Sequence, residues 1–458
     1  MKNFFLRIVV FILPLFSLFV SCSEDSSEPK EGLKGLSFVV SKINIEVGQQ
    51  EPSKLKYTMW NGQSSAYDTE KNPLNLKWTS SDKEIATVSE AGVVTGVKVG
   101  KAVIQVASAD DAVNASMTVT VASNEYLSQL EQGFEDGIVY SKGVKLVRNS
   151  VIQSIDVDSK GVLYYTQIAG TDEHNLHVIR GAANANYTDY MTFSFFGHGT
   201  NMALEEAEDE KYVWLGCYGT RGSDNSYGGS QTVCRIKYQA GNAYTPAQAT
   251  DQYYLPGVRN IHPAVNTESD LLAVTSSGGS ETGRMFRVYK LSEAKNSATT
   301  QMKLASSIKY GGGTSGIPEV TETPTVKVHD LSKLTKLAEF RVVEGSSSAD
   351  AIGHYPFQGF EVGNNRIYYY EGEGNNNDGA KASTAYVTVF DFSGQVVKKR
   401  SKVAPISDMS ALKNNGITTT GYMEAEGIKV HAGKLYLGFA SKSTDDVRRA
   451  VVLRYNID

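Results

Sequence analysis

A short sequence unit that recurs along the C-terminal part of the chain constrains the fold more than any other feature. The clearest copy is Gln358–Gly372, in which a polar residue and a glycine lead into a short strand, a tight turn and an aromatic, β-branched strand. Related copies are Gln153–Gln167 and Glu426–Ala440, and looser copies begin at His198 and Asn260. Such repetition is typical of repeat architectures, whose all-β version is the propeller. The sequence therefore predicts an all-β repeat domain.

Each copy is interpreted as the first half of a four-stranded blade, which gives a five-bladed β-propeller over residues 143–458. The fifth copy reaches the end of the chain without an outer strand, while the strand Val144–Arg148 precedes the first copy with no sheet of its own. Because an unpaired strand edge invites aggregation, we expect Val144–Arg148 to pair with Ala450–Ile457 and close the ring. Ser292–Lys336 is interpreted as a loop excursion with a short helix; strands hidden there would instead give six or seven blades.

Residues 36–122 alternate between apolar and polar positions, as half-buried strands do. Trp78 supplies a large apolar anchor for a core, and Gly92 and Gly96 occupy positions where turns need an unusual φ. This segment resembles the bacterial Ig-like group 2 family across nearly its whole length. The resemblance implies an N-terminal β-sandwich that acts mostly as a spacer and sometimes as an adhesive module.

Residues 1–22 have the features of an export signal. A basic start precedes an apolar core at Ile8–Val20, which is too short for a comfortable membrane span. The signal ends in residues 19–22, which resemble a lipobox with Cys22 as the lipidated residue. The first position, Phe19, departs from the usual aliphatic residue. An ordinary cleaved signal peptide is the alternative. The acidic stretch that follows resembles the surface-export signal of Bacteroidetes lipoproteins. We therefore expect a surface-exposed outer-membrane lipoprotein, held to the membrane only by its lipid, with a flexible tether over residues 23–35.

Charge and cysteine content narrow the range of partners. The formal net charge is −5 and no block of Lys and Arg is present, so nucleic acid is not expected as a partner. Cys217 and Cys234 are too few for a disulfide framework or a zinc site. On a symmetric hairpin they would lie opposite each other, as free thiols or as a strained bridge. Residues 123–142 are interpreted as a linker between the two domains.

Four motifs near the starts of the blades carry a further resemblance. They are Gln153–Asp156, Phe196–Asn201, Gln358–Glu361 and Glu424–Ile428. As an ordered set they resemble the five-bladed propeller of phage receptor-binding and teichoic acid biosynthesis protein C-like proteins, and helveticin J-type bacteriocins are similar. The resemblance implies attachment to a cell-surface polysaccharide. The Ig-like segment and the lipid signal depart from a phage protein, so a phage tail role does not carry over.

Polar residues at the starts of the innermost strands are the candidate ligand site. In a propeller these positions crowd around the axis, and they are Gln153, His198, Asn260 or His262, Gln358 and Glu426. We expect them to converge at one channel mouth. There they either bind a polar ligand or form hydrogen bonds with one another and with the backbone of the turns. Tyr218 and Tyr370 lie at predicted strand ends and are expected to be exposed, because tyrosine offers a sugar an apolar face with a polar handle.

A polysaccharide-cleaving enzyme is the main rival to a binding protein. Glycosidases need two carboxylates about 5–10 Å apart. The acidic candidates are Asp156, Glu205, Glu361, Glu424 and Glu426. No glycosidase signature accompanies them, so an enzyme is the less favoured interpretation, and a purely structural interaction module is a third. The sequence shows no metal-ligand spacing, phosphate loop or nucleophile elbow, so neither metal nor cofactor is expected. The preferred interpretation is a protein that binds a glycan or other cell-surface ligand.

Overall fold

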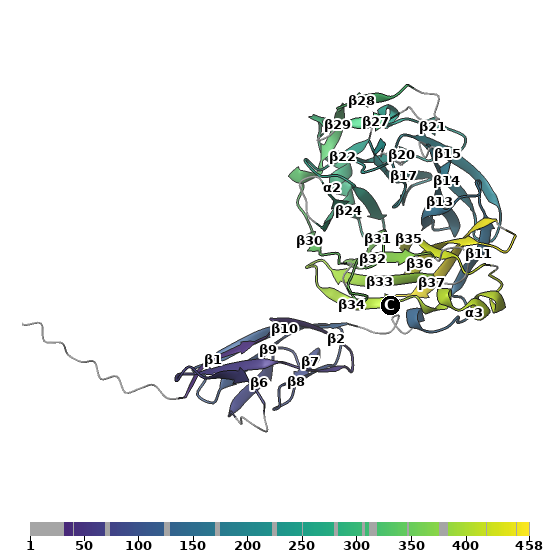
Figure 1. Ribbon diagram of the computed structural model, residues 1–458. Helices are drawn as coiled ribbons and strands as arrows, with labels where there is room; N and C mark the ends of the chain where they lie inside the picture. The colour runs from purple at the N-terminus through teal and green to yellow at the C-terminus, as the bar shows by residue number, and fades with distance from the viewer. Residues whose placement is uncertain are drawn as a thin grey trace, which may run out of the picture.

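The computed structural model describes two all-β parts of the chain (Figure 1). The described residues are 32–39, 41–68, 74–122, 129–169, 175–221, 227–249, 251–278, 283–304, 307–310, 318–345, 348–374, 383–417, 419–445 and 447–457. The predicted signal peptide with Cys22, the tether up to residue 31, and residues 123–128 of the predicted linker lie outside them. Over the described ranges, no helix is long and apolar enough to cross a membrane.

The N-terminal part is built from ten strands in three sheets. The strands are β1 (Leu33–Phe38), β2 (Lys42–Glu46), β3 (Gln50–Pro52), β4 (Leu55–Met59), β5 (Ser64–Ala66), β6 (Leu76–Ser80), β7 (Ala86–Val88), β8 (Val93–Gly96), β9 (Gly100–Ser108) and β10 (Asn114–Ala122). The sheet orders are β1-β4-β5, β2-β10-β9-β6 and β3-β8-β7. The alternation seen in the sequence is real, because β9 buries every second residue.

Trp78 packs against the core of this part, as the sequence predicts. Gly92 has a φ of 74°, and a Cβ atom there would lie 2.7 Å from the Trp78 ring, so glycine is needed for both reasons. Gly96 differs from its prediction. It has no positive φ, and it is needed instead because a Cβ atom would lie 2.5 Å from the carbonyl oxygen of Glu46.

The C-terminal part contains five sheets. The first has the order β12-β13-β14-β15-β21 and the second β16-β17-β20-β22-β29-β26. The strands of the first are β12 (Ile152–Val157), β13 (Val162–Ala169), β14 (Asn175–Ala182), β15 (Tyr187–Ser194) and β21 (Ala243–Tyr244). Those of the second are β16 (Ala203–Ala207), β17 (Glu210–Cys217), β20 (Thr232–Lys237), β22 (Gln252–Tyr254), β26 (Thr299–Lys303) and β29 (Thr325–Asp330).

The remaining three sheets have four strands each, in the orders β23-β24-β25-β30, β31-β32-β33-β34 and β35-β36-β37-β11. The strands of the third sheet are β23 (His262–Asn266), β24 (Leu271–Ser277), β25 (Arg284–Lys290) and β30 (Ala338–Val342). Those of the fourth are β31 (Phe357–Gly363), β32 (Arg366–Glu373), β33 (Thr384–Asp391) and β34 (Val396–Lys402). Those of the fifth are β35 (Met423–His431), β36 (Lys434–Lys442), β37 (Arg448–Asn456) and β11 (Val139–Lys145).

Short elements decorate these sheets. Two ribbons pair β18 (Thr220–Arg221) with β19 (Tyr227–Gly228) and β27 (Ile308–Tyr310) with β28 (Val320–Glu322). The helices are α2 (Leu291–Asn296), α3 (Met409–Asn414) and the 3₁₀ turns η1 (Pro246–Gln248), η2 (Leu331–Lys333) and η3 (Ala404–Ser407).

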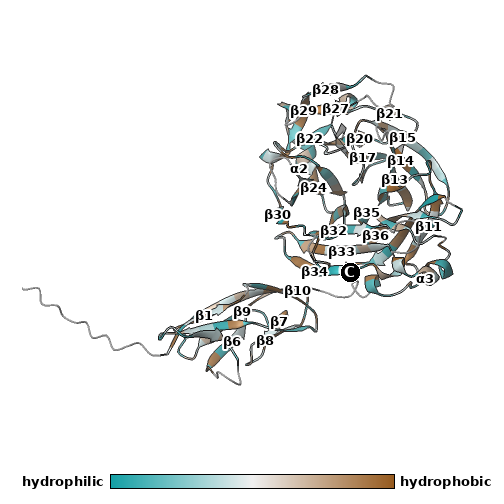
Figure 2. Cartoon of the chain, viewed as in Figure 1, coloured by the Kyte–Doolittle hydropathy of each residue, from teal (hydrophilic) through white to brown (hydrophobic). Residues whose placement is uncertain are grey.

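The strands β12, β16, β23, β31 and β35, called the inner strands, each form one edge of their sheet. Figure 1 labels two of them, β31 and β35, next to each other. Each inner strand contacts the next in cyclic order, and β35 contacts β12. The line that they surround is called the axis. Nearly every inner-strand residue is buried, because neighbouring sheets cover both faces, whereas a half-exposed strand would alternate. Figure 2 shows hydrophobic residues along the strands of these sheets. None of the sheets in the described ranges is itself closed into a barrel.

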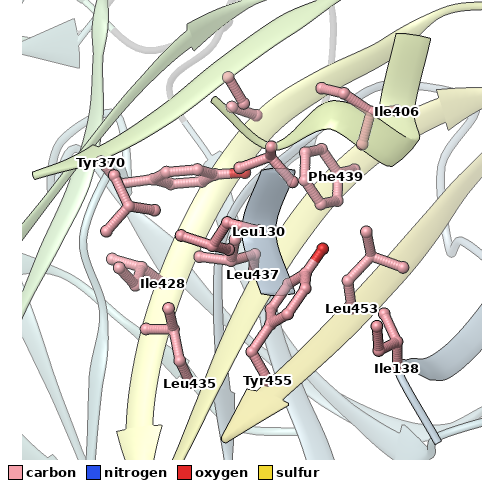
Figure 3. Packing of buried hydrophobic residues seen from close by; sticks show 14 of the residues in the cluster. Leu130, Ile138, Tyr370, Ile406, Ile428, Leu435, Leu437, Phe439, Leu453 and Tyr455 are labelled. Carbon is pink, nitrogen blue, oxygen red and sulfur yellow. The ribbon is translucent and has the colours of Figure 1, made fainter. Parts of the chain in front are cut away.

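The two ends of the C-terminal part pair as predicted, but with a different strand. β11 runs antiparallel to β37, with Val144 opposite Ala450, yet it spans Val139–Lys145, so residues 146–148 of the predicted strand lie outside it. The preceding residues also belong to this part. Leu130 and Ile138 are buried in the core against the fifth sheet, so the expected linker does not extend to residue 142 (Figure 3).

The insertion Ser292–Lys336 differs from its interpretation as a loop. It begins near the short helix α2, as expected, but it also adds β29 and β26 to the outer edge of the second sheet. Val326 and Val328 of β29 are buried while Thr325 and Lys327 are exposed, so the segment has the period of a strand. The run is short and lies far along the chain from its partner β22, which is why sequence reasoning missed it.

The two parts of the chain touch at the outer hairpin of the fourth sheet. Thr120 Oγ1 donates to Gln395 Oε1 at 2.6 Å, and Lys101 Nζ donates to Ser393 Oγ at 3.2 Å. Lys101 also forms an ion pair with Asp391. The Ig-like part therefore rests on this hairpin through polar contacts, each of which contributes little where solvent reaches it.

Candidate functional site

Three of the inner strands carry the same four-residue pattern. Gln153–Asp156, Gln358–Glu361 and Glu426–Lys429 each begin with a polar residue, continue with a small one and an apolar one, and end with a charge. In each strand the register with the following strand is shifted within or next to this pattern. Such bulges re-aim side chains at the end of a strand. The first and fourth positions of the pattern consequently have different surroundings.

The fourth positions meet at the axis around the ammonium group of Lys429. Its Nζ atom lies 3.1 Å from Asp156 Oδ2 and 3.0 Å from Glu361 Oε2, and it donates to the carbonyl oxygen of Val265 at 3.0 Å. Asp156 Oδ2 also accepts the backbone N–H of Leu204 at 2.7 Å. These residues come from β35, β12, β31, β23 and β16, so one cluster, called the axial hub, joins all five inner strands.

Burial dominates the electrostatics of the axial hub. It raises the pKa of Glu361 to about 7, against the opposing pull of Lys429. It raises the pKa of Asp156 as well, where Lys429 and two backbone N–H donors act in the other direction. The nearby carboxylates hold the pKa of Lys429 above its ordinary value despite its own burial. Two carboxyl groups thus share one cation, and one of them retains its proton more readily than an exposed acid would.

Asn201, two residues before β16, joins the inner strands β23 and β31 beside the hub. Its Nδ2 atom donates to the carbonyl oxygens of Pro263 at 2.6 Å and Phe360 at 3.1 Å, and its Oδ1 atom accepts the N–H of Phe360 at 3.0 Å. The second residue of each pattern is Ser or Gly, and its small size lets the inner strands approach one another closely. A Cβ atom on Gly427 would lie 2.4 Å from the backbone nitrogen of Ile155. Asn201 and the axial hub therefore fill the axis.

A cavity of about 460 Å³, called the axial pocket, opens beside the first positions of the pattern. Its lining residues are Ser150, Val151, Gln153, Ile168, His198, Thr200, Pro356, Phe357, Gln358, Glu424 and Glu426. The opposite end of the axis has a cavity of only about 30 Å³, lined in part by Asp156, Lys429 and His431. That is the space of about one water molecule in the liquid. Of these two cavities on the axis, the axial pocket is the one with room for an organic ligand.

Two side chains of the axial pocket are buried without a polar partner. Glu426 is 4% exposed and Gln153 is 6% exposed, and neither makes a hydrogen bond or ion pair with another residue of the described ranges. Burial and the neighbouring Glu424 hold the pKa of Glu426 well above its ordinary value, which favours the neutral acid. Buried polar groups are normally paired, so these two are candidates for ligand contact.

Other lining residues of the axial pocket are held in place by hydrogen bonds and a cation–π contact with residues outside the lining. Gln358 Nε2 donates to the carbonyl oxygen of Gly372 at 3.2 Å, which leaves its oxygen atom for other contacts. Glu424 accepts the hydroxyl group of Tyr422. The ring of Phe357 is backed by the guanidinium group of Arg284, 3.6 Å from the ring centroid. The pocket thus combines amide, carboxyl and aromatic surfaces.

The structure places the predicted axial residues in two groups. Gln153, His198, Gln358 and Glu426 lie together in the axial pocket. Asn260 and His262 do not line it. His262 Nε2 lies 3.1 Å from Asn260 Oδ1, and Asn260 Nδ2 donates to Ser277 Oγ at 2.8 Å. Burial, Arg284 and His198 lower the pKa of His262 to about 3, so the ring is neutral and packs near Phe357.

The two predicted tyrosines lie elsewhere. Tyr370 is wholly buried in the core between the fourth and fifth sheets, beside Ile428 and Phe439, so its expected exposure was wrong (Figure 3). It is not at the free end of a strand, because β32 continues to Glu373. Tyr218 is also buried, at 8% exposed, so its expected exposure was wrong too. It lines a separate cavity of about 400 Å³, where its hydroxyl group donates to the carbonyl oxygen of Pro246 at 3.4 Å.

The remaining chemical candidates have structural surroundings. Glu205 accepts Trp214 Nε1 at 2.8 Å and Arg235 Nε at 2.6 Å, so it is a paired core carboxylate. Cys217 and Cys234 are buried free thiols, and the strand register puts Thr232 and Leu215 opposite them, two positions away from the predicted facing pair. Among the described residues, no group of three or more His, Cys, Asp or Glu side chains is arranged to hold a metal ion.

Sequence reasoning missed several residues of the site. Phe357, Pro356 and Thr200 line the axial pocket, and Lys429 and Asn201 fill the axis behind it. A signal for the hub was present, because Asp156, Glu361 and Lys429 occupy the same position of three sequence copies. No comparable signal marked Phe357, which precedes the pattern in only one copy.

Comparisons with known proteins give only distant matches for the whole chain. No curated protein matches the sequence. The tail fibre of a Staphylococcus aureus phage matches at 13% identity and a TM-score of 0.43; the match covers 73% of this chain and 56% of the fibre. A Dyadobacter fermentans protein of unknown function matches at 10% identity and a TM-score of 0.33, over 70% of this chain and 100% of that one. An exo-1,5-α-L-arabinanase from a bovine ruminal metagenome matches at 8% identity and a TM-score of 0.22; the match covers 56% of this chain and 91% of the arabinanase. These scores are too low to carry an argument about fold or function.

The N-terminal part gives a clearer result. The profile of the bacterial Ig-like domain (group 2) matches residues 59–121. This range lies within the predicted segment 36–122 and includes Trp78, Gly92 and Gly96, on which the prediction depended. Residues 59–121 therefore belong to the group 2 family of bacterial Ig-like domains.

Proposed function

We propose that the C-terminal part, predicted to begin at residue 143 but including β11 from Val139, acts as a five-bladed β-propeller that is closed by β11 and binds a glycan or other cell-surface ligand in the axial pocket. Five sheets with inner strands in cyclic contact support the blade count. The pairing of β11 with β37 supports the closure, because it ties the two ends of the part into one sheet. The Ig-like domain then serves as the spacer.

The observation that carries the binding proposal is the pair of buried side chains with no described polar partner, Glu426 and Gln153. Both side chains line the axial pocket, so a ligand there can form hydrogen bonds with them without displacing a protein partner. Amide and carboxyl groups both donate and accept hydrogen bonds, which suits the hydroxyl groups of a sugar. Phe357 supplies an apolar surface for the face of a sugar ring.

A glycosidase is the second candidate, because two carboxyl groups, Glu424 and Glu426, line the axial pocket and the pKa of one is raised. Their placement argues against hydrolysis. Both come from β35, two residues apart, whereas the two carboxylates of a glycosidase flank the scissile bond. Glu424 is also engaged by Tyr422. Reducing-sugar release from any glycan that binds, lost in Glu426→Gln, would favour the enzyme over the binding protein.

The binding proposal is tested with a glycan array of plant, host and bacterial-surface oligosaccharides and the full chain in detergent. We expect at least one glycan to bind, and we expect Glu426→Ala and Gln153→Ala each to weaken it at least about tenfold, the loss of one buried hydrogen bond to a ligand. Glu268→Ala, at the opposite end of the axis, is the matched control. No binding to any glycan, or equal loss in the control, contradicts the proposal.

We also propose that the chain is a surface-exposed outer-membrane lipoprotein anchored through Cys22, without any other membrane contact. Cys22 follows the apolar signal core directly, and it precedes the acidic stretch. Cys22→Ala should release the protein or leave it as a precursor. Metabolic labelling with palmitate followed by membrane fractionation measures this, and a labelled, membrane-bound variant would exclude the anchor.

A further inference from the structure

We infer that the axial pocket takes the uncharged end of a glycan chain, and neither a chain interior nor an anionic sugar. The inference rests on the proposed function and specifies its ligand. Three features carry it: a blocked axis behind the pocket, a volume that fits few sugar rings, and a lining with two carboxyl groups and neither Lys nor Arg.

The axial pocket is blind. Along each patterned strand, the first position lines the axial pocket and the fourth position belongs to the axial hub, so the hub lies directly behind the pocket. Asn201 fills the space between, where a Cβ atom on Gly359 would already lie 2.9 Å from Asn201 Oδ1. The cavity at the far end shares no lining residue with the axial pocket. A polymer therefore has no passage along the axis, and only an end or a branch tip enters.

The size of the axial pocket agrees with a chain end. Its volume of about 460 Å³ lies in the lower part of the range of about 300–1,000 Å³ for sites that enclose one small ligand. The walls are also rigid, because the glycines and Asn201 pack against backbone atoms of neighbouring inner strands. The rest of a long chain would remain outside the pocket.

The charge of the lining selects against anions. Glu424 and Glu426 both line the pocket, and no Lys or Arg is among the lining residues. A carboxylate or phosphate on the ligand would meet the Glu424 carboxyl group with no Lys or Arg beside it, in a site where water screens poorly; His198 is the one basic side chain of the lining. Hydroxyl groups meet a matching set of donors and acceptors in Gln153, Gln358 and Glu426.

The test uses a neutral oligosaccharide that the array identifies, together with two derivatives of it. In the first, the terminal primary alcohol is oxidised to a uronic acid; in the second, the same chain is supplied as a long polymer at equal mass. Isothermal titration calorimetry with the full chain measures both. We expect the uronic derivative to bind at least about tenfold more weakly, and we expect the number of protein molecules bound per mass of sugar to fall in proportion to the number of chain ends.

Glu424→Gln provides an independent check, because it removes one acid of the lining with little change of shape. We expect this variant to discriminate less between the neutral and the uronic chain, while Glu268→Gln at the far end keeps the original ratio. Equal or tighter binding of the uronic chain, or stoichiometry that follows total sugar, overturns the inference and leaves the binding function standing. An array with no ligand at all contradicts the proposed function itself.

Discussion

Lys429→Met tests whether the axial hub stabilises the contacts between the five inner strands. The ammonium group contacts Asp156, Glu361 and the carbonyl oxygen of Val265, and the two carboxyl side chains are 1% and 3% exposed. Methionine fills a similar volume without charge, so the substitution removes the cation while it keeps the packing. Two acids then remain in the axis without a counter-ion.

The size of the effect follows from this burial. Removing one partner of a buried ion pair costs about 3–5 kcal/mol. For a large domain, each kcal/mol lowers the unfolding temperature by about 2 °C. We therefore expect the transition of the C-terminal part to fall by roughly 6–10 °C at pH 8.

The effect also depends on pH, with a sign that the pKa values fix. A carboxyl group whose pKa is raised by folding, as for Glu361 at about 7, binds its proton more tightly in the folded state. Its contribution to stability is therefore greatest at pH values below its unfolded pKa and falls as the pH rises toward 7. Without Lys429 the pKa values of Asp156 and Glu361 rise further. The penalty of Lys429→Met should shrink at pH 5, where both acids take up protons.

Differential scanning calorimetry is the assay, because it separates the transitions of the two parts of the chain. Lys434→Met on the next strand is the matched control, since that ammonium group contacts the exposed Asn456. Adding Glu361→Gln to Lys429→Met should recover part of the loss by removing one uncompensated charge. A shift below 2 °C at pH 8, or the same shift at pH 5, would refute the view that the axial hub holds the inner strands together.

Three further predictions follow from the packing. Gly427→Ala should destabilise the fold by about 1–3 kcal/mol in chemical denaturation, because its Cβ meets the backbone of β12; Gly241→Ala, also at positive φ but in open space, should cost less. Deleting residues 1–149 removes β11 and should prevent folding of the C-terminal part, whereas deleting residues 1–128 should not, as circular dichroism would show. Glu426→Leu should raise the unfolding temperature while abolishing glycan binding, because it removes an unpaired buried group; an unchanged or lower temperature would contradict the unpaired state.

Local patterns in the sequence were enough to predict most strands. The strand pairs of the five copies are hairpins, so their period of two and their turns lie within a few residues of each other. The β11–β37 pairing joins distant segments, yet it was predictable because one spare strand and one incomplete sheet had to be matched. The strands β26 and β29 were missed because no sheet lacked a strand that they would complete. Their own sequences also do not indicate which sheet they join.

The sequence predicted which residues begin the inner strands, but not which groups those residues contact. Gln153, His198, Gln358 and Glu426 were chosen because they begin inner strands, and they do lie together. The same argument selected Asn260 and His262, which bond to each other and to Ser277 instead. Whether a polar side chain faces a cavity or a partner depends on distances of a few ångströms across neighbouring sheets. Sequence spacing along one strand does not determine those distances.

The contrast between the first and fourth positions of the repeated pattern separates a structural role from a functional one. At the fourth position Asp156, Glu361 and Lys429 satisfy one another and nearby backbone groups, as buried charges must if the fold is to be stable. At the first position Glu426 and Gln153 are nearly as buried, but they line the axial pocket and have no hydrogen-bond partner among the described residues. Apolar residues there would stabilise the same strands without that cost. Groups that lower stability without serving the fold are expected where a protein meets its ligand. The first positions, and not the more densely charged fourth positions, are therefore where binding should be sought.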